Sequence, residues 1–206
     1  MSVDATALLG ADRNLSWHAG VVTAAVGAHI GPWSEEDLVG LPTDSQRYEL
    51  LEGTLLVSPP PGGRHQLVSW EVTRELKQAA PPGLVVVEAM GVRLPNDTVF
   101  VPDVLVAERH AVVTNRSGIL DHSTVTLIAE IVSPGSRTQD RLTKPALYAQ
   151  AGIGSFWRVE LEQEPTVFAC RLDAGVYVEV TSARPGEQLV VNDPFPICFD
   201  PGNLQL

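Results

Sequence analysis

Two short apolar runs, each interrupted by a single acidic residue, constrain this chain more than any other feature. Asp103 lies in the apolar run at residues 100–106, and Glu130 lies in the run at residues 127–133. Both runs are short and rich in β-branched residues, which favours buried strands. An unpaired charge inside such a strand costs several kcal/mol, so each carboxylate needs a partner.

The two acids can be partners of one another through a metal ion. Lone acids on neighbouring strands can face each other across ~5 Å, the spacing of a cross-strand pair. At that distance two carboxylates repel strongly unless a cation lies between them, and oxygen-only ligands suit Mg²⁺ or Mn²⁺. We therefore predict that Asp103 and Glu130 bind a divalent metal. Two alternatives stay open: Asp103 as a strand-end acid that accepts backbone amides after Pro102, and Glu130 in a buried salt bridge to an arginine.

Lys144 is one of only two lysines in a chain that otherwise uses arginine for positive charge. The other lysine is Lys77, and twelve arginines accompany them. A compact ammonium beside a nucleophile or a phosphate is one reason to use lysine in such a chain. The alternative interpretation is a solvated helix residue that occurs here by chance.

The remaining sequence predicts an α/β chain in which helices are few and strands are numerous. Helices are predicted from the N-cap Ser34 to about residue 39, over residues 65–80, and over residues 136–151, where Pro145 predicts a kink or a start near Thr143. Strands are predicted as a hairpin about Glu52 and Gly53, at residues 84–90, 99–107 and 124–132, and then at residues 155–160, 166–172, 176–180 and 188–191.

Length and composition indicate one domain. With 206 residues the chain can form one full core, and we expect a loosely attached extension at residues 1–30 followed by a single domain at residues 31–206. No apolar run approaches the ~20 residues of a membrane span, and no signal peptide is recognisable, so we expect a cytoplasmic protein without a membrane partner. Cys170 and Cys198 are too few for a disulfide scaffold and form no zinc motif.

A set of short motifs, in this order and spacing, resembles the Uma-type family of restriction endonuclease-like proteins. That family was formerly catalogued as a domain of unknown function and belongs to the PD-(D/E)xK nuclease superfamily. The residues that carry the resemblance extend over most of the chain and are Tyr48 to Gly53, His65, Pro102, Asp103, Glu130 to Pro134, Asp140, Lys144, Tyr148, Ala149, Gly152, Phe156 and Trp157.

The resemblance implies a restriction-endonuclease-like core, with a central mixed β-sheet flanked by helices, an extra N-terminal hairpin and additional C-terminal strands. It implies a metal held by Asp103 and Glu130, and it makes Glu52 an additional acid that approaches the metal from the first hairpin. The superfamily usually has a lysine two positions after the glutamate, where this chain has Val132. In this family the corresponding lysine lies on the next helix instead, and Lys144 matches that position.

The resulting hypothesis is a Mg²⁺- or Mn²⁺-dependent endonuclease that hydrolyses phosphodiester bonds in DNA, with Asp103, Glu130, Lys144 and Glu52 as catalytic residues. The alternative is a catalytically inactive member of the fold that serves as a binding or assembly module. The formal charge of -11 repels phosphate backbones at long range, so any basic contacts must be confined to one cleft. For that reason we also expect a homodimer, in which basic residues of two chains converge.

Other residues of the motif set receive structural interpretations. His65 is interpreted as a polar residue at a helix N-terminus, with a catalytic base as the alternative. Asp140 is interpreted as a helix cap or a salt-bridge partner. Tyr148 and Trp157 are interpreted as core residues, because aromatic residues at such spacings usually pack inside.

Overall fold

The computed structural model describes residues 29–204, so most of the extension expected at residues 1–30 lies outside the described residues. The helical segments are α2 (Glu35–Val39), α3 (Gly63–Ala79), α4 (Arg109–Thr114), α5 (Lys144–Gln150), η1 (His122–Thr124), η2 (Gln139–Thr143) and η3 (Pro201–Leu204). The strands are β1 (Arg47–Leu51), β2 (Thr54–Ser58), β3 (Leu84–Glu88), β4 (Gly91–Leu94), β5 (Thr98–Phe100), β6 (Val104–Glu108), β7 (Ile119–Asp121), β8 (Val125–Val132), β9 (Ser155–Glu160), β10 (Thr166–Asp173), β11 (Val176–Ala183), β12 (Leu189–Val191) and β13 (Ile197–Phe199).

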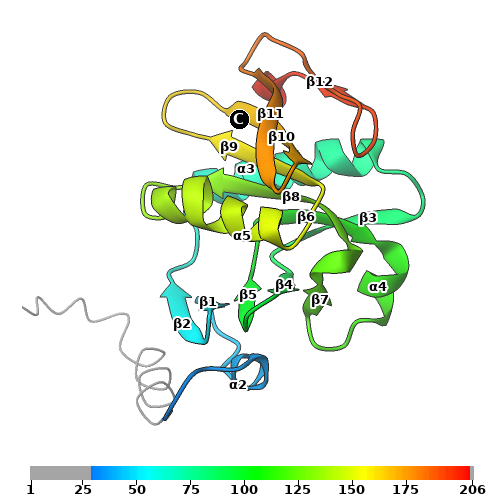
Figure 1. Ribbon diagram of the computed structural model, residues 1–206. Helices are drawn as coiled ribbons and strands as arrows, with labels where there is room; N and C mark the ends of the chain where they lie inside the picture. Colours follow the sequence, from blue (N-terminus) through cyan, green and yellow to red (C-terminus); the bar gives the residue numbers. More distant parts are fainter. Residues whose placement is uncertain (1–28, 205–206) are drawn as a thin grey trace, which may run out of the picture.

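A six-stranded mixed sheet forms the centre of the fold, in the order β11-β10-β9-β8-β6-β3 (Figure 1). Strands β8 and β9 run parallel, and the other neighbouring pairs of this sheet are antiparallel. Strand β8 is buried along almost its whole length, which explains its nearly continuous apolar sequence.

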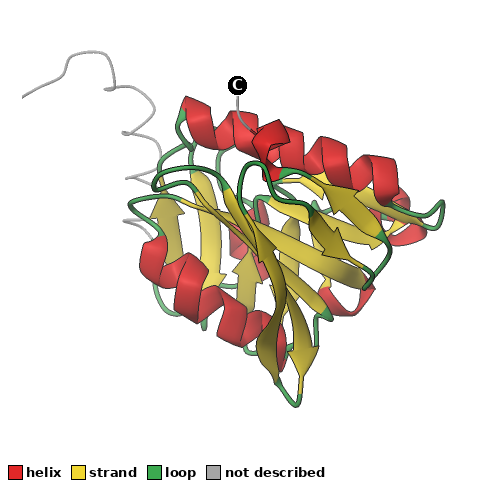
Figure 2. Cartoon of the chain, turned by 90° about the horizontal axis from the view of Figure 1, so that it is seen from above, coloured by secondary structure: helices red, strands yellow, loops and turns green. Residues whose placement is uncertain are grey.

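Helices cover both faces of this sheet (Figure 2). On one face, Val68, Val72 and Leu76 of α3 join the core formed by alternate residues of β6, β8 and β9. On the other face, Tyr148 of α5 packs with the intervening residues, such as Leu105 and Ile128. The predicted α/β architecture, a central mixed sheet flanked by helices, is confirmed.

The first hairpin belongs to a second sheet of five strands, in the order β2-β1-β5-β4-β7. The hairpin turns at the predicted place, where Glu52 has φ 48° and Gly53 has φ 75°. Two consecutive residues in the left-handed region are typical of the type I′ turn that favours glycine. A Cβ atom on Gly53 would lie 3.0 Å from Cβ of Pro32, so the position has little room for a side chain as well.

The predicted strand at residues 99–107 is divided in two, which corrects the sequence-based expectation. Strand β5 pairs with β1 and β4 in the five-stranded sheet, whereas β6 pairs with β3 and β8 in the six-stranded sheet. The chain crosses between the sheets at residues 101–103, where Pro102 lacks the N–H that a central strand would need. Asp103 therefore lies at the entrance of β6 rather than in the middle of a strand.

The helix predicted at residues 136–151 includes the π-helical turn η2 and continues as α5. The helical backbone is continuous from residue 137, so the helix does not start near Thr143; Pro145 instead directly follows the π-helical turn, an irregularity that accompanies many proline positions within helices. The predicted cap of the first helix is also present, since Ser34 and Asp37 form a reciprocal capping box. Three short strands, β4, β7 and β13, and helix α4 were not anticipated.

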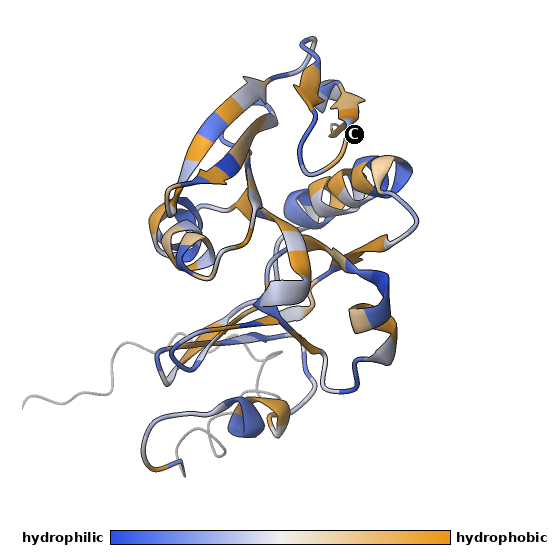
Figure 3. Cartoon of the chain, turned by 45° about the vertical axis from the view of Figure 1, so that its right-hand side comes forward, coloured by the Kyte–Doolittle hydropathy of each residue, from blue (hydrophilic) through white to orange (hydrophobic). Residues whose placement is uncertain are grey.

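The C-terminal strands form an outer hairpin and a small sheet. Along β11, apolar and polar residues alternate (Figure 3), and Val176, Val178 and Val180 are exposed. Strands β12 and β13 pair with each other; β13 packs against α3, and β12 packs against β11. Within residues 29–204, no helix is both long and apolar enough to cross a membrane.

Candidate functional site

Asp103 and Glu130 come together where β6 and β8 run side by side. The antiparallel register pairs Val104 with Ala129, so one step further places Asp103 opposite Glu130. Both residues have the parity of Leu105 and Ile128, whose side chains point to the α5 face of the sheet. Both carboxylates are buried, at 3% and 0% exposure. The register thus places the two acids on neighbouring strands at the same level of the sheet, and the metal binding expected of them stays a prediction.

The Asp103 carboxylate has three partners. Its Oδ1 lies 2.8 Å from Nη2 of Arg47, and its Oδ2 accepts hydrogen bonds from Nε2 of His65 at 3.1 Å and from the Ile131 amide at 2.8 Å. Burial by itself raises the pKa of Asp103, but His65, Arg47 and the Ile131 amide outweigh it and lower the pKa to about 2. Asp103 is therefore ionised at neutral pH.

Glu130 is less well compensated. Its Oε1 accepts a hydrogen bond of 2.7 Å from the Tyr148 hydroxyl and lies 3.2 Å from Nζ of Lys144. Its Oε2 is buried and has no hydrogen-bond partner among the described residues. Burial, opposed by Lys144 and assisted by the neighbouring carboxylates, raises the pKa of Glu130 to about 8.

Lys144 is the first residue of α5 and extends toward three acids. Its Nζ lies 3.1 Å from Glu49, 3.2 Å from Glu130 and 3.9 Å from Asp140. Burial lowers the pKa of Lys144, but the surrounding carboxylates outweigh this effect and raise it above its usual range. Lys144 is consequently a permanent ammonium group, and the interpretation as a solvated helix residue is wrong because its side chain is only 4% exposed.

The hairpin contributes Glu49 to this cluster instead of Glu52. Glu52 occupies the exposed hairpin turn and does not line the pocket. Glu49 is 2% exposed, and its Oε1 contacts Nζ of Lys144 and accepts a hydrogen bond from the Val101 amide. The physical reason is the period of the strand: the buried position in mid-strand faces the six-stranded sheet, whereas the turn projects away from it.

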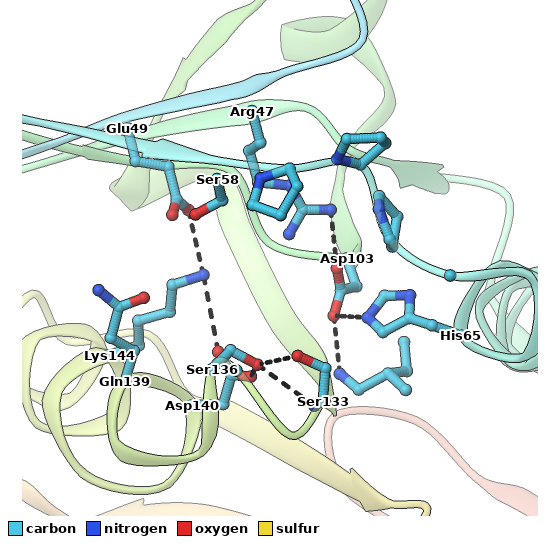
Figure 4. A pocket seen from close by; sticks show the side chains of 16 residues that line it. Arg47, Glu49, Ser58, His65, Asp103, Ser133, Ser136, Gln139, Asp140 and Lys144 are labelled. Carbon is cyan, nitrogen blue, oxygen red and sulfur yellow. Dashed lines mark hydrogen bonds and ion pairs between the residues drawn. The ribbon is translucent and has the colours of Figure 1, made fainter. Parts of the chain in front are cut away.

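These side chains surround a pocket of about 290 Å³ (Figure 4). Lys144, Glu49 and Asp140 form one side of it, and Arg47, Asp103 and His65 form the other. The residues that complete the wall are Ser58 to Gly62, Ile131, Ser133, Gly135, Ser136 and Gln139. Glu130 itself does not line the pocket: it is fully buried, and its carboxylate contacts Lys144, which lines the pocket, and Tyr148.

Asp140 and His65 take the positions that their structural interpretations expected, a salt-bridge partner and a helix N-terminal residue, and both also line the pocket. Asp140 is buried, accepts a hydrogen bond from the Ser136 hydroxyl and faces Lys144. His65 lies in the first turn of α3, where its Nε2–H donates to Asp103 because an ionised carboxylate can only accept. Its Nδ1 is buried and has no hydrogen-bond partner among the described residues. Trp157 is a core residue as predicted, and Tyr148 is a core residue whose hydroxyl also reaches Glu130.

Arg47 and Glu49 were missed by reasoning from the sequence. Both stand in β1, whose only pairing that the sequence indicated is the local hairpin with β2, so nothing in their spacing relates them to Asp103 or Lys144. A signal was available for Glu49: it is an acid at a mid-strand position whose neighbours Leu50 and Leu51 are apolar, the same pattern that singled out Asp103 and Glu130.

No preformed metal cage is present in the part of the chain that the structure describes, since no three His, Cys, Asp or Glu side chains there converge with metal-binding geometry. The donor chemistry nevertheless suits a divalent ion. Four carboxylates (Glu49, Asp103, Glu130 and Asp140) face two permanent cations (Arg47 and Lys144), and one carboxylate oxygen of Glu130 is unpartnered. Mg²⁺ commonly keeps several waters and binds through one or two carboxylates, so Asp103 and Glu130 fit it.

Comparisons with known proteins agree with this architecture. Four chains of solved structures are significantly similar. One of them is the crystal structure of a "putative nuclease belonging to DUF820" from Anabaena variabilis ATCC 29413, with a TM-score of 0.62 and 18% identity, covering 84% of this chain and 97% of that chain. At this identity the similarity establishes a common fold, and it confirms the predicted fold class.

Among curated proteins, no significant match was found. Residues 35–202 match the family model Uma2, described as "Putative restriction endonuclease". The match covers most of the chain and confirms the resemblance that the motifs indicated. This chain therefore belongs to the Uma2 family.

Proposed function

We propose that this chain is a divalent-metal-dependent endonuclease that hydrolyses phosphodiester bonds in DNA. The observation that carries the proposal is the convergence of Asp103, Glu130 and Lys144. Two acids from adjacent strands lie on one face, and an ammonium group from the following helix lies 3.2 Å from one of them. Membership of the Uma2 family and the nuclease-like fold support the same chemistry.

Asp103 and Glu130 are the proposed metal ligands. Oδ1 of Asp103 and Oε2 of Glu130 are both buried without a hydrogen-bond partner among the described residues, and Arg47 lies against Oδ1. A buried carboxylate oxygen without a partner costs about 1 to 3 kcal/mol, which a bound cation would remove. Glu49 replaces Glu52 as the additional acid, because it is the hairpin carboxylate that faces Lys144.

A divalent cation bound here would polarise a phosphoryl oxygen and lower the pKa of a bound water. Lys144 supplies a fixed positive charge beside this position, where negative charge develops as the phosphate is attacked. Because its pKa is raised, Lys144 acts as a charge and a hydrogen-bond donor, not as a base. Glu49 and Asp140 hold the ammonium group from two further directions, so its position is determined before the substrate binds.

The test is cleavage of mixed DNA substrates with Mg²⁺ or Mn²⁺ by the native chain and by Asp103→Asn and Glu130→Gln, with folding verified by circular dichroism. Each substitution keeps the size of the side chain and removes its charge, and we expect activity to fall by about 100-fold or more. Glu52→Gln is the matched control, since it removes a carboxylate from the same hairpin outside the pocket. Equal activity of native chain, Asp103→Asn and Glu130→Gln would remove the proposal.

An inactive binding or assembly module is the second candidate, favoured by Val132 in the position where the wider superfamily has its lysine. Calorimetry separates the two candidates. A nuclease site should bind Mg²⁺ or Mn²⁺ in a way that depends on Glu130, and an inactive binding or assembly module should show no such binding. Binding that survives Glu130→Gln unchanged would favour the module.

A further inference from the structure

Arg47 stands at the border between two cavities. It is the first residue of β1, and its guanidinium group reaches Asp103 at the pocket described above. The same side chain also lines a second cavity of about 420 Å³, on the side of Tyr48, Pro61 and Val99. Its side chain is 21% exposed. Arg47 therefore borders two cavities and keeps part of its side chain exposed.

The other permanent cation of the pocket is held in place. Lys144 is 4% exposed, and three carboxylates surround its ammonium group. Within the described residues, Arg47 has a single ion-pair partner, which is Asp103. Of these two cations, Arg47 is therefore the one that an incoming metal ion can displace.

The two oxygens of Asp103 are held differently. Oδ2 is bound by His65 and by the amide of Ile131, so it is fixed by the helix and the neighbouring strand. Oδ1 meets only the guanidinium group of Arg47, without hydrogen-bond geometry. Oδ1 is buried, and the guanidinium group of Arg47 lies against it, so a metal ion could reach Oδ1 only if Arg47 moved away (Figure 4).

A guanidinium group and a divalent cation repel each other, so both cannot occupy Oδ1. The planar fork of arginine also matches the oxygens of a phosphate group in a bidentate contact. Resting on the function proposed above, we propose that Arg47 is a substrate-binding residue that shields Asp103 in the metal-free chain and turns to a backbone phosphate of the nucleic acid when a divalent cation takes Oδ1. Arg47 then contacts Asp103 in the metal-free site and a backbone phosphate in the metal-bound site.

The proposal predicts opposite effects of one substitution. Arg47→Ala removes a competitor of the metal, so Mn²⁺ should bind at least about fivefold more tightly than in the native chain, a typical size for coupling between two sites. The same substitution removes a phosphate contact, so the KM for duplex DNA should rise. A residue with a purely structural role would weaken metal binding or leave it unchanged.

Titration calorimetry with Mn²⁺ on the full chain tests the first effect, in the native chain, Arg47→Ala and Glu130→Gln. The matched control is Arg93→Ala, which removes an arginine paired with Glu35 outside the pocket and should leave Mn²⁺ binding unchanged. Equal or weaker Mn²⁺ binding by folded Arg47→Ala would overturn the inference. Absence of Glu130-dependent binding in the native chain would instead overturn the proposed function, so the two failures are distinguishable.

Arg47→Lys covers the case in which Arg47→Ala does not fold, because a lysine still compensates the buried Asp103. It keeps the positive charge and loses the bidentate fork. We expect Mn²⁺ affinity near that of the native chain, with a raised KM for duplex DNA and a kcat within about twofold, since the lost contact is formed equally in the ground state. A KM equal to that of the native chain would exclude the phosphate contact.

Discussion

The ammonium group of Lys144 lies 3.1 Å from a carboxylate oxygen of Glu49, so helix α5 and the first hairpin meet directly across the pocket. The contact joins two segments that are almost 100 residues apart in the chain. It also unites the two sheets, because β1 belongs to the five-stranded sheet and α5 covers the six-stranded one. The pocket exists only because these two layers are held together.

The first prediction separates the two acids of the hairpin. Glu49→Gln should lower the rate of metal-dependent DNA cleavage by roughly 10- to 100-fold, since a group that positions Lys144 loses its charge. Glu52→Gln should leave the rate unchanged, because Glu52 is exposed in the turn. Single-turnover cleavage assays compare the two variants, and a greater loss in Glu52→Gln would mean that the hairpin acids are assigned in the wrong order.

The second prediction concerns the hydroxyl of Tyr148, which donates to the buried carboxylate of Glu130. Tyr148→Phe removes this donor and should lower the free energy of unfolding by about 1 to 3 kcal/mol, because a buried acceptor loses a partner. Tyr177→Phe is the control, since its hydroxyl donates at 2.7 Å to the neutral carbonyl oxygen of Ile153. Urea denaturation in EDTA measures the free energy of unfolding of both variants. A smaller loss for Tyr148→Phe than for Tyr177→Phe would contradict the expected stabilisation of the buried Glu130 carboxylate by the Tyr148 hydroxyl.

The third prediction follows from the raised pKa of Glu130. In the folded chain this pKa is about 8, above the ordinary value of 4.5, mainly because the group is buried. The folded state therefore binds the proton more tightly than the unfolded state. The resulting stabilisation is complete below the unfolded pKa and is lost as the pH rises through the folded pKa.

Urea denaturation in EDTA at about pH 5 and about pH 8.5 brackets this range. The native chain should lose more stability over the interval than Glu130→Gln, whose side chain does not titrate. Asp103, with a pKa lowered to about 2, is ionised throughout the interval and contributes no slope to it. The same loss in both proteins would show that Glu130 does not titrate there.

The fourth prediction is a homodimer. The formal net charge of -11 disfavours the approach of DNA to a single chain, whereas two chains can line one channel with the arginines of both. Sedimentation at micromolar concentration should therefore give about twice the mass of the 22.1 kDa chain. A monomer under these conditions would contradict the prediction.

Much of this protein follows from local sequence. The apolar runs around Asp103 and Glu130 indicated adjacent buried strands, and Glu52 with Gly53 indicated the hairpin of β1 and β2, because strand burial and turn geometry depend on near neighbours. The ordered motifs also identified the family and predicted that Lys144 lies at the same site as Asp103 and Glu130.

Tertiary structure alone decided the rest. The bend at Pro102 sends β5 and β6 into different sheets, and this places Glu49 and Arg47 against a pocket whose other wall comes from α5. Such contacts are not encoded in spacing along the chain, because they depend on how two sheets pack. The choice of Glu49 over Glu52, and the contact of Arg47 with Asp103, therefore became visible only in three dimensions.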